Sequence, residues 1–202
     1  MNMNMNMNMN QTIAGTRSAH LSVPGSGSEH LDWHVWEAKD GTSVLVRPIE
    51  PDDFELERQF VDGLSARSGF QRLLSPRRPS ALEIKRWTQV DRPREGVLIA
   101  TVRSQGEEQQ IGVARYAIDG EDGEADFAIV IGDAWHGIGV GAHLVSSLIE
   151  LARKSGVGQL SGITLSENRA MLGLARRLGF KLSRVPGDGI VTRVSLALHP
   201  EA

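Results

Sequence analysis

The apolar and polar positions along the chain predict seven β-strands. Each is a short run rich in Val, Ile and Leu and bounded by turn residues. The runs cover residues 42–49, 96–102, 110–118, 125–131, 160–165, 180–185 and 190–198. Residues 125–131, "ADFAIVI", are almost continuously apolar, which is typical of a central strand covered on both faces.

Four helices are predicted between these strands. Leu56, Phe60 and Leu64 recur every fourth residue and give the first helix one apolar face. Ser80-x-x-Glu83 is a capping-box signature, which predicts a helix over residues 81–88. Two more helices follow the glycine-rich stretch at 137–141 and the segment "SEN" at 166–168. The resulting order β-α-α-β-β-β-α-β-α-β-β predicts an α/β fold with a single mixed sheet and helices on its faces.

The N-terminal part of the chain has a different composition. Residues 1–30 begin with the repeat "MNMNMNMNMN" and stay rich in Ser, Gly and Pro, so they predict a low-complexity, flexible extension. The predicted domain covers residues 31–202. Trp33 and Trp36 at its start could pack on the core or on a second copy of the chain, as in a homodimer; packing on the core is the simpler interpretation.

Composition narrows the function classes. The 202-residue chain has a formal net charge of −3 and no cysteine. The charge argues against a nucleic-acid-binding protein. The lack of cysteine excludes disulfides, thiolate metal sites and a cysteine nucleophile, and favours the cytoplasm. No apolar run approaches the ~20 residues of a membrane span, and His20, His30 and His34 lack metal-ligand spacing. We therefore expect neither a membrane partner nor a metal.

The stretch "HGIGVG" at residues 136–141 carries the main chemical signal. It lacks the Gly-Lys-Ser/Thr of a Walker loop, and its match to a dinucleotide fingerprint is weak because "GDAWH" separates strand and glycines. A simple tight turn that packs helix on strand is the structural alternative. The third interpretation is a backbone cradle for a pyrophosphate, such as that of coenzyme A, at a helix N-terminus.

Two motifs in this order resemble the GNAT superfamily of acyl-CoA-dependent N-acetyltransferases. "HGIGVG" is similar to the family's Arg/Gln-x-x-Gly-x-Gly/Ala loop, with His136 at the Arg/Gln position, and "SENRAMLGLARRLGF" resembles its Asn-containing helix, with Asn168 at the asparagine. The finer resemblance is to the catalytic domain of bacterial protein lysine acetyltransferases. It implies a mostly antiparallel sheet of six to seven strands flanked by helices.

The resemblance also implies acetyl-CoA as cosubstrate and a set of binding residues. In the family, pantetheine lies in a split between two parallel strands and pairs with the backbone of one of them. Here the implied backbone contacts are Ile129, Val130 and Ile131, and the pyrophosphate would lie among His136, Gly137, Ile138, Gly139, Val140, Gly141 and Ala142, with Asn168 nearby.

The acceptor implied by the resemblance is a primary amine, either a small molecule or a protein lysine. The protein-acetyltransferase branch places a glutamate in "AEFA"; this chain has "ADFA", so Asp126 takes the position of the general base, with Glu124 as an alternative. The tyrosine that many GNAT enzymes use as acid is replaced by Ala175. With no cysteine, direct attack in a ternary complex is favoured. A catalytically weak acyl-CoA-binding or regulatory module is the rival hypothesis.

Overall fold

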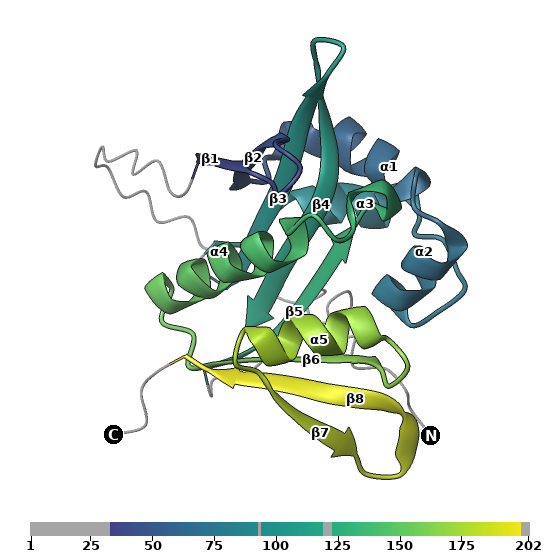
Figure 1. The fold of residues 1–202 in the computed structure, drawn as a ribbon, viewed down its shortest axis with the longest axis vertical. Helices are drawn as coiled ribbons and strands as arrows, with labels where there is room; N and C mark the ends of the chain where they lie inside the picture. The colour runs from purple at the N-terminus through teal and green to yellow at the C-terminus, as the bar shows by residue number, and fades with distance from the viewer. Residues whose placement is uncertain (1–32, 93, 119–122, 199–202) are drawn as a thin grey trace, which may run out of the picture.

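The computed structural model describes residues 33–92, 94–118 and 123–198 (Figure 1). The predicted extension at residues 1–30 and the proposed domain start at Leu31 lie outside these residues. The described part forms one eight-stranded sheet in the order β1-β2-β3-β4-β5-β6-β8-β7. All neighbouring strands are antiparallel except β5 and β6, which are parallel. The predicted mixed, mostly antiparallel sheet is thus confirmed.

Three helices separate the first two strands from β3, and α4 and α5 lie on either side of β6 in the chain. The bounds of the strands are β1 His34–Glu37, β2 Ser43–Pro48, β3 Glu95–Ser104, β4 Glu107–Ile118, β5 Glu124–Ile131, β6 Gln159–Leu165, β7 Lys181–Val185 and β8 Asp188–Ala197. The α-helices are α1 Phe54–Asp62, α2 Ala66–Leu73, α3 Ala81–Thr88, α4 Val140–Lys154 and α5 Arg169–Arg177. Short 3-10 turns, η2 Pro51–Asp53 and η3 Asp133–Trp135, precede α1 and follow β5.

The helices cover both faces of the sheet, as Figure 1 shows, with α4 on one face and α1 and α3 on the other. Side chains of the central strands β3, β4 and β5 enter two apolar clusters, one on each face of the sheet. Leu98 and Ala100 of β3 pack on the α4 side, and Val97 and Ile99 pack with Phe60 of α1 on the opposite side. This two-sided burial is the reason that the central strands are almost continuously apolar in sequence. None of the helices that the structure describes is long and apolar enough to span a membrane.

Two elements were not predicted. Strand β1 is too short to show periodicity. Val35 and the preceding residue Trp33 are exposed, while Trp36 packs on the core. Its pairing with β2 raises the strand count to eight, one more than the predicted maximum of seven. Helix α2 has mostly polar residues and begins at Ser65, whose side chain accepts a hydrogen bond from the Ser68 N–H. Packing on the core, the simpler of the two interpretations of this segment, is confirmed for Trp36 but not for Trp33, which is exposed.

Candidate active site

The parallel strands β5 and β6 pair over only three positions. Glu124, Ala125 and Asp126 are matched by Gln159, Leu160 and Ser161 of β6. Beyond Asp126 the structure records no further pairing between the two strands within the described residues, although β5 continues to Ile131 and stays paired with β4 on its other edge. The backbone of the C-terminal half of β5 is therefore available to a ligand on the β6 side.

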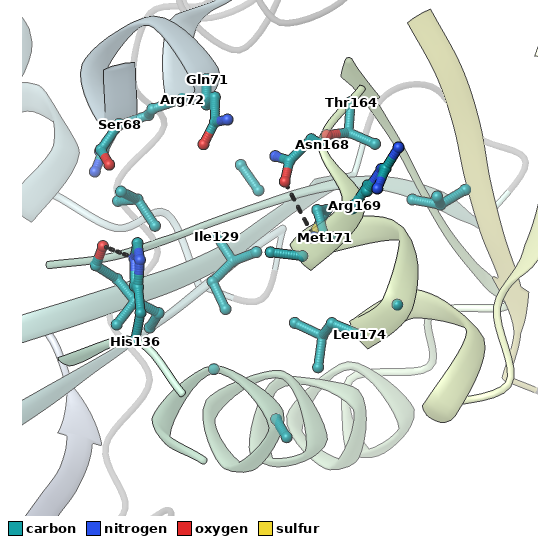
Figure 2. A pocket seen from close by; sticks show the side chains of 18 of the residues that line it. Ser68, Gln71, Arg72, Ile129, His136, Thr164, Asn168, Arg169, Met171 and Leu174 are labelled. Atoms are coloured by element: carbon teal, nitrogen blue, oxygen red, sulfur yellow. Dashed lines mark hydrogen bonds between the residues drawn. The ribbon is translucent and has the colours of Figure 1, made fainter. Parts of the chain in front are cut away.

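A cavity of about 600 Å³ occupies the gap between the two strands. Residues of β5 and β6 form its floor, the glycine loop and α4 border one end, and α2 and α5 close its sides. In Figure 2, Ile129 of β5 lies between His136 and Met171, and Gln71 of α2 and Asn168 point toward the same space. The predicted contacts Ile129, Val130 and Ile131 all line this cavity.

The glycine loop exposes backbone donors at one end of the cavity. Gly137 and Gly139 have φ values of +83° and +105°, a left-handed conformation that side chains rarely adopt, and Gly139 is the N-cap of α4. The N–H groups of residues 136–142 donate to no protein acceptor in the part of the chain that the structure describes. An anion is the natural partner for such a group of free donors at a helix N-terminus.

The side chains in this loop have different surroundings. Val140 is buried in the core, and Ile138 packs against it, so these two residues present only backbone to a ligand. The Nε2–H of His136 donates to the Ile131 carbonyl at 2.9 Å, which holds the loop against the end of β5. Gly137, Gly139, Gly141 and Ala142 line the cavity directly. The predicted loop residues therefore divide into those that can touch a ligand and those that shape the loop.

Asn168 lies at the other side of the cavity, at the N-terminus of α5. Its Oδ1 accepts a hydrogen bond from the Met171 N–H at 3.1 Å, which makes it the N-cap of the helix (Figure 2). Because the oxygen is used in the cap, the amide nitrogen is the group that remains for a ligand. Arg169 and Arg177 of α5 also line the cavity, and they add positive charge on this side.

The sequence did not point to Lys39, which follows β1 and borders the glycine loop. Its N–H donates to the Ile138 carbonyl at 3.1 Å, and its Cε lies 3.8 Å from the position that a Cβ on Gly139 would take. The side chain is exposed and lines the cavity. Since β1 itself has no clear sequence pattern, only its pairing with β2 reveals that Lys39 is near the loop.

Trp36 of β1 packs against the glycine loop and the first turn of α4. Its ring stacks on His143 of α4 with centroids 4.5 Å apart, and it lies 3.1 Å from the Cβ position of Gly139. Burial and the neighbouring His34 lower the pKa of His143, which favours the uncharged form of the ring that stacks on Trp36. The N-terminal strand thus fixes the first turn of α4.

We expect Lys39→Ala to weaken binding of acetyl-CoA by about 2- to 10-fold, because an exposed cation near a phosphate contributes modestly in water. Isothermal titration at two ionic strengths measures the effect, which should shrink at high salt. Lys85 of α3 is equally exposed and lies outside the cavity lining, so Lys85→Ala is the control. An affinity that is unchanged at low salt in Lys39→Ala would show that this side chain does not contact the ligand.

Asp126 lies at the last paired position of β5 before the gap opens. Its Oδ1 accepts a hydrogen bond from the Ser161 hydroxyl at 3.2 Å, and the residue is partly buried and is not among those that line the cavity. Glu124, the alternative base, is exposed and accepts a hydrogen bond from Gln159. Tyr116 is buried in the core beside Gly96 and Leu151, so it cannot act as an acid in the cavity.

Helix α2 supplies cavity residues that the sequence did not indicate. Ser68, Gln71 and Arg72 line the cavity from this helix. Asp133 of η3 holds α2 next to β5 by accepting hydrogen bonds from the Ser65 N–H and the Ser68 hydroxyl. Among the described residues, no group of three or more His, Cys, Asp or Glu is arranged to hold a metal.

Comparisons with known proteins agree with this geometry. The family described as "Acetyltransferase (GNAT) domain" matches residues 43–181. An acetyltransferase of Pseudomonas aeruginosa is 33% identical over 186 residues, which cover 92% of this chain and 97% of that protein. The acetyltransferase Pat of Mycolicibacterium smegmatis is 28% identical over 161 residues, 79% of this chain and 48% of that protein.

Solved structures share the fold. The GNAT domain of S. lividans PAT superposes with a TM-score of 0.75 at 26% identity, covering 85% of this chain and 99% of that one. The family match, the relative of nearly equal length and the open strand pair beside a glycine loop lead to one assignment: this chain belongs to the GNAT family of acetyl-CoA-dependent acetyltransferases.

Proposed function

We propose that this protein transfers an acetyl group from acetyl-CoA to a primary amine by direct attack in a ternary complex. The observation that carries the proposal is the separation of β5 and β6 beside the glycine loop. The free N–H groups of residues 136–142 suit the pyrophosphate, and the unpaired edge of β5 at Ile129, Val130 and Ile131 suits the amides of pantetheine.

The chemistry follows from the positions of these groups. A lysine-type amine has a pKa of about 10.4, so only about one molecule in 10³ is neutral near pH 7. Asp126 is the proposed base that takes the ammonium proton, through a water molecule if the acceptor lies in the cavity beyond the carboxylate. The neutral nitrogen then forms a bond to the thioester carbonyl carbon and the carbon–sulfur bond breaks. The second proton lost by the nitrogen passes to the departing thiolate, so that coenzyme A leaves as the free thiol. A β5 N–H would stabilise the developing oxyanion.

The acceptor is the finer part of the proposal. The resemblance to bacterial protein lysine acetyltransferases supports a protein lysine, and the cavity between α2 and α5 also has room for a small amine. The rival hypothesis is a module that binds acyl-CoA without turnover. Asp126 in place of glutamate and Ala175 in place of the family tyrosine are the observations that favour this rival.

Calorimetry and a turnover assay test the proposal together. We expect acetyl-CoA to bind in isothermal titration with micromolar affinity, on the order of −8 kcal/mol, and free thiol to appear when an amine acceptor is added. The acceptor panel contains small primary amines, free amino acids and a lysine-containing protein. Binding without thiol release over the whole panel would favour the binding module, and failure to bind would reject both hypotheses.

A further inference from the structure

Two arginine side chains are largely buried next to the α2 end of the cavity. The guanidinium of Arg72 lies 4.3 Å from the centroid of the Trp87 ring, and that of Arg115 lies 5.4 Å from it. Arg72 also pairs with Glu57 at 3.2 Å, and the Arg115 Nη2 donates to the Trp87 carbonyl at 3.2 Å. The side chain of Arg72 is only 8% exposed, and it lines the cavity beside Gln71.

The charges in this cluster do not balance. Within residues 33–92, 94–118 and 123–198, Glu57 is the only carboxylate that pairs with either arginine, and Gln110 shares it. The nearby pair Arg86–Glu95 is neutral as a unit. Two guanidinium groups against one carboxylate leave one positive charge in excess. A buried charge without a counter-charge is costly. Because Arg72 lines the cavity and Arg115 does not, an anion would offset the excess charge from the Arg72 side.

Hydrogen-bond donors in the cluster are also unused. Arg72 Nη1 and Arg115 Nε are buried and have no acceptor among the described residues. Burial lowers the pKa of Arg72, and burial together with the charge of Arg72 lowers the pKa of Arg115 to about 10. Both groups remain cationic at pH 7. A buried donor that lacks an acceptor destabilises the protein, so a shift of the Arg72 side chain toward an acceptor in the cavity would be favourable.

We propose that the α2 end of the cavity binds a carboxylate of the acceptor, with Arg72 as its main partner. The acceptor is then a small amino-carboxylate such as a free amino acid, and not a lysine within a protein chain. The guanidinium would meet the carboxylate, and the Gln71 amide, which points into the cavity in Figure 2, is placed to donate a second hydrogen bond. This inference rests on the acetyl transfer proposed above.

The first test uses the unmodified protein and pairs of acceptors. Each free L-amino acid is compared with its own carboxamide, which keeps the amine and side chain but has no negative charge. We expect kcat/KM for thiol release to be about 10- to 100-fold higher for the free acid, the effect of one charged hydrogen-bonded contact. The third acceptor in the comparison is a peptide with an internal lysine and blocked termini, which represents a lysine within a protein chain.

The second test assigns the preference to Arg72. Arg72→Met should remove most of the difference in kcat/KM between acid and carboxamide, mainly by raising KM for the acid. Arg72→Lys should retain part of this difference, because lysine keeps the positive charge but lacks the paired N–H donors of the guanidinium group. Arg58 of α1 is exposed and pairs with Glu55, so Arg58→Met is a control that should keep the full preference. Titration of acetyl-CoA into each variant shows that the coenzyme site is intact.

The outcomes separate this inference from the proposed function. Equal rates for acids and carboxamides, or a faster reaction with the lysine peptide, would overturn the carboxylate site and leave acetyl transfer standing. Thiol release from no acceptor, with acetyl-CoA still bound, would overturn the proposed function and the inference with it. A variant Arg72→Lys that loses all preference while folded would reject a charge-based role for this residue.

Discussion

Replacing Gly141 by valine is expected to reduce acetyl-CoA affinity by about 100-fold, because side-chain atoms that fill a snug pocket exclude the ligand. A Cβ at this position would lie 3.5 Å from Ile131 Cγ1, 3.7 Å from Leu174 and 3.9 Å from Ile129. These are ordinary contacts, so the protein can accept the side chain. The added methyl groups would occupy cavity space that the ligand needs. Isothermal titration measures the affinity, and the thermal midpoint reports the fold.

Other glycines provide the comparisons for this variant. Gly69→Val on α2 adds the same atoms at a helical position where nothing lies within 4 Å, and we expect it to leave acetyl-CoA affinity unchanged. Gly139→Val differs in kind, because its φ of +105° and its 3.1 Å approach to Trp36 add strain to the protein itself. If Gly141→Val binds acetyl-CoA normally, the ligand does not pass this residue and the loop has another role.

Replacing Asp126 by asparagine is expected to lower kcat by about 10²- to 10⁴-fold, the contribution typical of a general base. The amide keeps the size of the side chain and can still accept the hydrogen bond from Ser161. Acetyl-CoA affinity should therefore stay the same. A pH profile adds a second readout: because the variant depends on acceptor that is already neutral, its rate should continue to rise toward the acceptor pKa.

Glu124→Gln is the matched control for Asp126. Glu124 is exposed and bonds to Gln159, and its replacement should change kcat by less than about two-fold, as for most surface changes away from a site. The reverse result, a large loss in Glu124→Gln and none in Asp126→Asn, would transfer the base role to Glu124. Equal small effects would leave general-base catalysis to a group of the acceptor or to water.

Local patterns were sufficient for the elements that carry their own signals. Helix α3 begins and ends where the Ser80–Glu83 capping box predicts, with both reciprocal hydrogen bonds present. Residues 127–131 of strand β5 are all apolar because clusters on both faces of the sheet bury them. Such elements need little tertiary context, since caps and periodicity are properties of adjacent residues.

Elements stabilised mainly by distant contacts could not be predicted. Helix α2 has a weakly apolar sequence, and it is held by Asp133, 65 to 68 residues away in the chain. Strand β1 has four residues and depends on its pairing with β2. The cavity contributions of Arg72 and Lys39 follow from these two elements. They were missed for the same reason, whereas the glycine loop and the apolar run of β5 carry their own signals in the sequence.

The gap between β5 and β6 divides the sheet into two parts, which are joined by three residue pairs and by an apolar cluster with residues from both parts. A pantetheine arm that is hydrogen-bonded along β5 would lie in the gap like an additional strand and connect the two parts of the sheet. Binding of the coenzyme would then raise the free energy of unfolding. Once the site is nearly saturated, each further tenfold rise in coenzyme concentration adds ~1.4 kcal/mol. The thermal midpoint of this protein is therefore expected to rise with the concentration of acetyl-CoA even when no acceptor is present.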